Sequence, residues 1–220
     1  MAQRAPSQAV ARAMLSELTP RARGAVPQRG NALSKWLGRS VLRLLGWRVI
    51  GELPQAPKVL VIAAPHSSNL DAVVGFAAVL AMGLNVSWMG KDSLFRGPLK
   101  WLARWGGGIP VNRSGSARGQ VQSAIAEFNR RETFWCALAP EGTRKPVERW
   151  RTGFYRIAEG AKVPLILCHF DYPSRVVGMG PLFHLSGDMP TDLALINAHY
   201  APYLGKGGKR VNVLGNQRAV

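Results

Sequence analysis

The chain has 220 residues, 47% of them hydrophobic, and a formal net charge of +17. This length suits one domain with a substantial core, so we expect a single active site. The charge favours anionic partners, namely nucleic acid, phospholipid headgroups or phosphorylated small molecules, without distinguishing them. The two cysteines, Cys136 and Cys168, lie in apolar runs. They argue against a disulfide framework or a metal pair and favour a reducing, cytosolic compartment.

The two ends of the chain are basic and lack sustained periodicity. Residues 1–33 are rich in Arg, Ala, Pro and Gly, without the apolar core of a secretory signal, and are interpreted as a flexible tail. Residues 206–220 are interpreted as a solvated basic tail, which leaves 34–205 as the domain. The longest apolar stretch, 72–84, is shorter than the ~20 residues of a membrane-spanning helix. Any membrane contact should therefore be monotopic.

An amphipathic helix is expected to begin near Ser34. Its apolar side would carry Trp36, Leu37, Val41, Leu44 and Leu45, and its basic side Lys35, Arg39 and Arg43. Such a helix either packs on the core or anchors the protein at an anionic lipid surface, and the two interpretations are compatible.

From residue 57 onward, short apolar runs alternate with helical patterns. Strands are predicted at 58–63, 86–89, 134–138 and 164–170, and helices at 69–82, 99–105, 116–130 and 152–160. Repeated strand-then-helix order implies right-handed crossovers and a largely parallel sheet flanked by helices. The fold class is therefore α/β.

The segment from Ala63 to Val74 places His66 where a strand ends and a helix begins. Functional sites of such sheets gather at these positions. On one continuous helix, His66 and Asp71 would point about 140° apart. If His66 lies in the loop before the helix, its imidazole can reach Asp71 and keep its other nitrogen free as a general base. Ser68 and Asp71 also match a capping pattern, so Asp71 alternatively only starts the helix.

Three further segments follow in order: GGIPVNR at 107–113, PEGTR at 140–144 and VPLIL at 163–167. With HSSNLD at 66–71, they resemble the four ordered blocks of the phospholipid and glycerol acyltransferase family, which includes PlsC-like 1-acylglycerol-3-phosphate acyltransferases. The resemblance covers about residues 34–170 and implies a glycerolipid-acyltransferase-like α/β fold.

The resemblance also implies a reaction. His66 takes a proton from an acceptor hydroxyl, which attacks the thioester of acyl-CoA or acyl-ACP, and Asp71 steadies the imidazolium. Substrate-binding residues carried over from the family are Lys91, Arg113, Glu141, Gly142, Thr143 and Arg144. Arg113 and Arg144 would hold the phosphate of a lysophosphatidic-acid-like lysolipid. No metal or bound cofactor is implied, and the expected location is peripheral, on the cytoplasmic face of the cell membrane.

The chain departs from the family pattern at Pro65, Ala139 and Asn112, where Asn, Phe and Asp are usual. These changes leave His66 and Asp71 intact but affect the blocks that shape the acceptor pocket. A non-phosphate lysolipid, such as a lyso-aminolipid, is therefore the alternative acceptor.

Other function classes remain as competitors. A serine hydrolase is disfavoured because no GxSxG turn occurs, and a specific nucleic-acid partner because no zinc-finger or RNA-binding signature appears. A family member that only binds lipid is disfavoured by the intact His66, Asp71 and residues 141–144.

Overall fold

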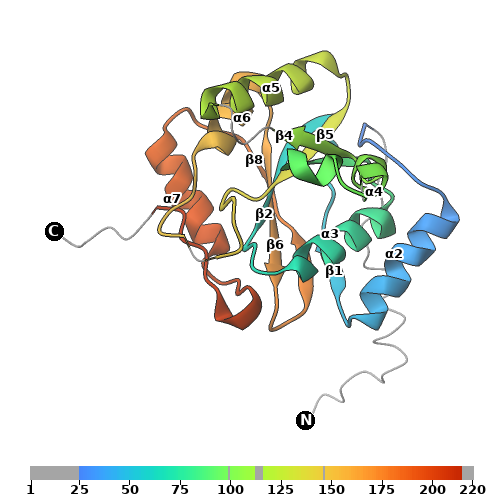
Figure 1. Ribbon diagram of the computed structural model, residues 1–220. Helices are drawn as coiled ribbons and strands as arrows, with labels where there is room; N and C mark the ends of the chain where they lie inside the picture. Colours follow the sequence, from blue (N-terminus) through green and yellow to red (C-terminus); the bar gives the residue numbers. More distant parts are fainter. Residues whose placement is uncertain (1–24, 99, 112–115, 146, 215–220) are drawn as a thin grey trace, which may run out of the picture.

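The computed structural model describes residues 25–98, 100–111, 116–145 and 147–214. These residues form an eight-stranded sheet with helices on both faces (Figure 1). The strands are β1 (Arg48–Gly51), β2 (Lys58–Ala64), β3 (Val86–Lys91), β4 (Gly108–Val111), β5 (Phe134–Leu138), β6 (Leu165–Asp171), β7 (Val176–Met179) and β8 (Leu182–Phe183). The helices are α2 (Ala32–Leu44), α3 (Asn69–Met82), α4 (Lys100–Trp105), α5 (Ala117–Arg130), α6 (Gly153–Ala161) and α7 (Met189–Tyr200), with short 3-10 turns at Asp92–Phe95 and Lys206–Gly208.

The strand order is β1-β7-β6-β2-β5-β3-β4, with β8 beside β6. From β6 to β4 every neighbouring pair is parallel, whereas β7 and β8 run antiparallel to β6. The predicted α/β class with a largely parallel sheet is therefore confirmed. The short strands β1, β4, β7 and β8 were not predicted, because runs of two to four residues carry little periodic signal. Helix α7, which has 12 residues, was also not predicted.

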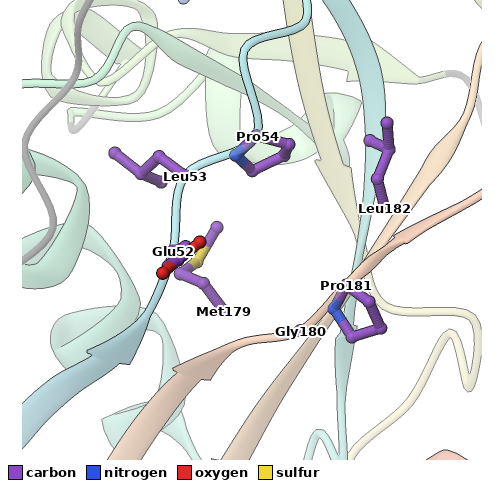
Figure 2. Close-up of a pocket in the computed structure, with 7 residues that line it drawn as sticks. All are labelled: Glu52, Leu53, Pro54, Met179, Gly180, Pro181 and Leu182. Atoms are coloured by element: carbon purple, nitrogen blue, oxygen red, sulfur yellow. The ribbon is translucent and has the colours of Figure 1, made fainter.

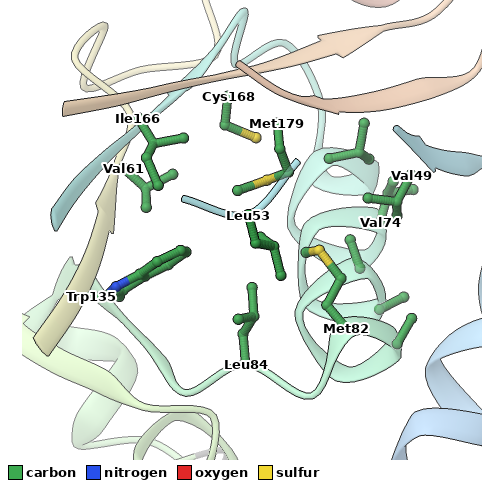
Figure 3. Packing of buried hydrophobic residues seen from close by; sticks show 14 of the residues in the cluster. Val49, Leu53, Val61, Val74, Met82, Leu84, Trp135, Ile166, Cys168 and Met179 are labelled. Carbon is green, nitrogen blue, oxygen red and sulfur yellow. The ribbon is translucent and has the colours of Figure 1, made fainter. Parts of the chain in front are cut away.

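Both faces of the central strand β2 are buried, which explains its nearly continuous apolar sequence. Val59 and Val61 face a cluster formed with α2 and α3, part of which Figure 3 shows around Val61, Val74 and Trp135. Leu60 and Ile62 face a second cluster formed with α5, α6 and α7. The sheet is thus fixed between two cores, and the loops at its strand ends start from rigid supports.

The predicted amphipathic helix is present as α2 and packs closely on α3. A Cβ atom on Gly38 would lie 2.6 Å from the Ala77 carbonyl oxygen, so only glycine permits this approach. Leu42 is buried, whereas Trp36 and Leu44 are 61% and 86% exposed. The helix therefore packs on the core and still presents apolar side chains to its surroundings. Among the described helices, none has the length and apolar character needed to cross a membrane.

Parts of both segments that were expected to be flexible or solvated tails pack against the domain. Val26 is buried, and Gln28 forms an antiparallel bridge with Leu84. At the other end, the side chain of Lys209 is only 8% exposed and Val213 is buried, so neither is solvated. Residues 1–24 and 215–220 of the predicted tails lie outside the described residues.

Candidate active site

The candidate site lies where three adjacent strands end. β5, β2 and β6 are neighbours and parallel, so their carboxyl ends meet at one edge of the sheet. Glu141 follows β5, His66 follows β2 and Tyr172 follows β6. This is the edge at which α/β sheets place functional groups.

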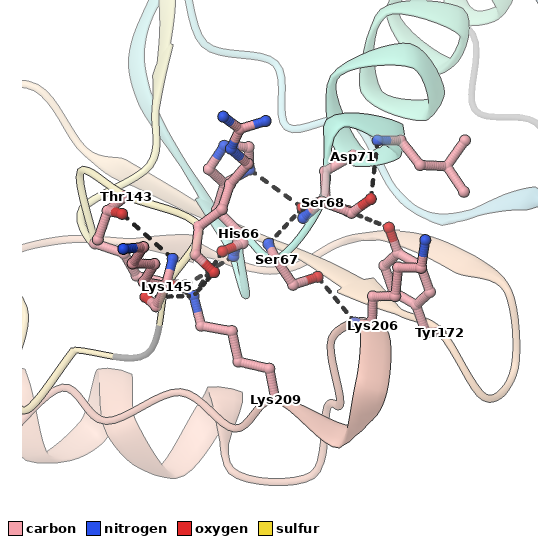
Figure 4. A network of polar contacts seen from close by, with 12 residues as sticks. His66, Ser67, Ser68, Asp71, Thr143, Lys145, Tyr172, Lys206 and Lys209 are labelled. Atoms are coloured by element: carbon pink, nitrogen blue, oxygen red, sulfur yellow. Dashed lines mark hydrogen bonds and ion pairs between the residues drawn. The ribbon is translucent and has the colours of Figure 1, made fainter.

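His66 lies in the loop between β2 and α3, as the spacing to Asp71 required. Its Nδ1 is 3.2 Å from Oδ2 of Asp71 (Figure 4). The His66 side chain is 28% exposed, whereas that of Asp71 is 1% exposed. The buried carboxylate therefore orients the ring through Nδ1, and Nε2 is the nitrogen left for a substrate. This geometry is suited to a general base.

Asp71 makes the contacts that both alternative interpretations require, one with the His66 ring and one with the start of α3. Its Oδ2 accepts hydrogen bonds from the backbone N–H groups of Ser67 (2.5 Å) and Ser68 (2.7 Å), completing a capping box at the start of α3. Its Oδ1 accepts from the hydroxyl of Tyr172. Burial alone would raise the pKa of Asp71, but hydrogen bonds from His66, Tyr172 and the two amides hold it below its usual value. Asp71 is therefore a carboxylate at neutral pH and can act as the counter-charge of an imidazolium at His66.

Glu141 was expected to bind substrate, but its side chain lies buried behind the His66 loop. Its side chain is 1% exposed, and both oxygens have protein partners. Oε1 accepts from the His66 backbone N–H at 2.7 Å, and Oε2 forms an ion pair with Lys209. A carboxylate in this position supports the His66 loop and does not face a ligand.

Gly142, Thr143 and Arg144 of the third block are exposed. Gly142 has a φ of +65°, a left-handed conformation that favours glycine, and closes a turn onto Ala139. Thr143 accepts a hydrogen bond from the Lys145 backbone, and Arg144 is exposed. The Arg144 backbone is tied to the His66 loop because both carbonyls accept from the ammonium of Lys209.

Two candidate residues are not placed by the structure. Arg113 lies outside the described residues, and Lys91 ends β3 with its side chain outside the described part of the chain. The structure therefore brings together His66, Asp71, Glu141 and Arg144. The contribution of Arg113 and Lys91 to the expected phosphate site stays a prediction.

Two residues of the site were missed by sequence reasoning. Tyr172 directly follows β6, so a polar residue at the end of a predicted parallel strand was an available signal. Lys209 is 143 positions from His66 and lies in a segment interpreted as a solvated tail, so no local pattern indicates its role.

One hollow in the described part of the chain lies away from the candidate site. A shallow hollow between Glu52–Pro54 and Met179–Leu182 lies toward the opposite end of the sheet, near the amino end of β6 (Figure 2). In the part of the chain that the structure describes, no three His, Cys, Asp or Glu residues are grouped to hold a metal ion.

Comparison with known families defines the class of this protein. A family model described as "Acyltransferase" matches residues 48–170, which include β2, the His66 loop and the third block. This match spans more than half of the chain, and the protein therefore belongs to the acyltransferase family. A comparison with curated proteins finds no match.

Among solved structures, the chain is similar to the 1-acyl-sn-glycerophosphate (LPA) acyltransferase PlsC from Thermotoga maritima. The TM-score is 0.54 at 16% sequence identity, over 76% of this chain and 75% of that chain. At this identity the likeness supports a shared fold, and the predicted PlsC-like architecture is confirmed.

Proposed function

We propose that this acyltransferase moves a fatty acyl group from acyl-CoA or acyl-ACP to the hydroxyl of a lysophospholipid of the lysophosphatidic-acid type. The observation that carries the proposal is the contact of 3.2 Å between Nδ1 of partly exposed His66 and the buried carboxylate of Asp71. The fold-level likeness to an LPA acyltransferase supports the choice of a glycerolipid substrate.

The proposed reaction is a direct transfer. Nε2 of His66 takes the proton of the acceptor hydroxyl as its oxygen attacks the thioester carbonyl carbon. The carbon–sulfur bond then breaks, and the leaving thiolate takes the proton back from His66. Asp71 stabilises the imidazolium between these two steps. The products are an ester and a free thiol, and the neutral imidazole is restored.

Arg144 is the described residue best suited to hold the acceptor phosphate. It is exposed, and its backbone lies beside the His66 loop through their shared contact with Lys209. A guanidinium donates paired hydrogen bonds that match phosphate oxygens. We expect Arg113 and Lys91 to contribute to the same phosphate site, with Gly142 and Thr143 shaping its wall.

The central experiment follows free thiol release from acyl-CoA and from acyl-ACP in the presence of different lysolipids. Lysophosphatidic acid should support the fastest thiol release, with an acylated lipid formed in equal amount. Preference for a lyso-aminolipid would move the acceptor to the non-phosphate class. Thiol release without any acceptor would identify a thioesterase, and salt-dependent DNA binding without thiol release would favour a nucleic-acid-binding protein.

Arg144→Ala should raise the KM for the phosphate-bearing acceptor about 10- to 100-fold, because hydrogen bonds to charged groups contribute about 1.5–3 kcal/mol. The KM for the acyl donor should change much less. Initial rates at varied lysophosphatidic acid and acyl-CoA concentrations separate the two. Arg156→Ala, which removes an exposed arginine from α6, is the matched control. A larger effect on the donor KM would contradict the assignment.

We also propose that the protein docks on the anionic cytoplasmic membrane surface through α2. Leu33, Trp36, Leu37 and Leu44 are exposed on this helix, which also carries Lys35 and Arg43. Apolar groups beside lysine and arginine suit the boundary between lipid headgroups and acyl chains.

Trp36→Glu should weaken co-sedimentation with anionic phospholipid vesicles about tenfold or more, since burying a large apolar side chain contributes about 1.5–3 kcal/mol. Equal co-sedimentation of the variant and wild type would contradict this docking mode.

A further inference from the structure

We propose that Lys209, in the segment that follows α7, is a positioning residue for acyl transfer: its ammonium fixes the His66 loop against the turn formed by residues 140–144. The inference rests on the proposed function, in which His66 is the base. It adds a residue that lies outside the four sequence blocks and outside the stretch 48–170 that matches the family.

The ammonium of Lys209 lies between the His66 loop and the turn at residues 140–145 (Figure 4). It donates to the His66 carbonyl at 2.6 Å and to the carbonyls of Arg144 and Lys145 at 3.3 and 3.2 Å. It also forms the ion pair with Glu141, whose other oxygen accepts from the His66 backbone N–H. Both the N–H and the C=O of His66 are therefore held by one buried ion pair.

The ion pair is inaccessible to a substrate. The side chains of Lys209 and Glu141 are 8% and 1% exposed, and the three ammonium protons are shared among four oxygen acceptors. No donor is left over for a phosphate. Lys209 therefore acts through the position of His66 and does not contact the lipid.

The segment that carries Lys209 is itself anchored to the same strand ends. The Lys206 backbone N–H donates to Oγ of Ser67 at 2.9 Å, and the Tyr172 N–H donates to the Leu204 carbonyl at 2.9 Å. Beyond Lys209, Val213 is 3% exposed and packs in the second core. The lysine thus reaches the site from a backbone held on both sides.

Loss of the ammonium would leave Glu141 buried without its cation. Burial already raises the pKa of Glu141, and the hydrogen bonds from Lys209 and the His66 amide oppose that rise. Without Lys209 the pKa of Glu141 should rise further, so that a larger share of the carboxyl is protonated and accepts the hydrogen bond of the His66 amide less strongly. Activity should then depend on the ionisation of Glu141.

The test compares Lys209→Met with wild type in the thiol-release assay. We expect kcat to fall about 10- to 100-fold, since a displacement of about 1 Å in a catalytic group costs up to about 10²-fold. The KM values for donor and acceptor should stay within about threefold. The kcat of the variant should show an additional step that rises with pH and that the double variant Glu141→Gln/Lys209→Met lacks. Arg210→Met removes an exposed charge from the next position and should keep the wild-type kcat.

Each other outcome overturns the proposal. An unchanged kcat would mean that the ion pair is not needed for positioning, and a raised KM with unchanged kcat would make Lys209 a substrate-binding residue. A lowered kcat without the additional pH step would reduce Lys209 to a structural role. Wild type that releases no thiol with any lysolipid would instead refute the proposed function, so the two failures are distinct.

If Lys209→Met does not fold, the double variant takes its place. It leaves no charge buried alone, and removal of both members of a buried ion pair is often tolerated. The amide oxygen introduced by Glu141→Gln can still accept from the His66 backbone N–H, whereas the links to the carbonyls of His66, Arg144 and Lys145 are lost. Positioning by Lys209 predicts that kcat falls about tenfold or more relative to Glu141→Gln alone. An equal kcat in the two variants would contradict it.

Discussion

His66→Ala should lower kcat for acyl transfer by about 10²- to 10⁴-fold, the usual contribution of a positioned general base. The loss should fall on kcat more than on either KM, because the imidazole acts on the proton that leaves the hydroxyl during attack. Thiol release from acyl-CoA in the presence of the best lysolipid measures this directly.

The fold should tolerate this substitution. Asp71 keeps its hydrogen bonds from the amides of Ser67 and Ser68 and from the hydroxyl of Tyr172, so no buried carboxylate is left without partners. His184→Ala is the matched control, since His184 is exposed and follows β8 at the opposite end of β6. If His66→Ala retained more than about a tenth of the wild-type kcat, His66 would not be the base.

Asp71→Asn should lower kcat by about 10²-fold or more while the protein stays folded. The amide oxygen can take the place of Oδ2 and accept from Ser67 and Ser68, and the amide nitrogen can donate to the oxygen of Tyr172. What is lost is the negative charge beside Nδ1 of His66, which stabilises the imidazolium and selects the tautomer. Steady-state kinetics together with circular dichroism separate the loss of activity from loss of fold. Unchanged turnover would mean that Asp71 serves only as a helix cap.

The same substitution has a consequence for stability at acid pH. Because folding lowers the pKa of Asp71 from its ordinary value of 3.8, its ionisation stabilises the wild type above that pH. This contribution is lost as pH falls through the lower pKa of the folded state. Asp71→Asn should therefore unfold at a temperature that depends less on pH in the acid range. Melting curves recorded at several pH values check this, and identical acid profiles would contradict the lowered pKa.

Several elements of the fold were readable from local pattern. The run at 58–63 became β2, and the helix predicted at 69–82 has the observed bounds of α3. Both are long, buried elements in which apolar periodicity reports directly on packing. The strands β1 and β7 have four residues each and pair with one another at the sheet edge, so their existence depends on a partner distant in sequence.

The chain's own sequence determined the α/β class, the acyltransferase resemblance and the choice of His66 and Asp71 as candidates, because each depends on local periodicity or on short motifs that can be read in order along the chain. Only the tertiary structure decided that Tyr172 and Lys209 join them and that Glu141 supports the loop rather than facing a ligand. These residues come from the ends of β6 and β5 and from the segment after α7. Their meeting depends on strand order and on how the chain end packs, which no local spacing encodes.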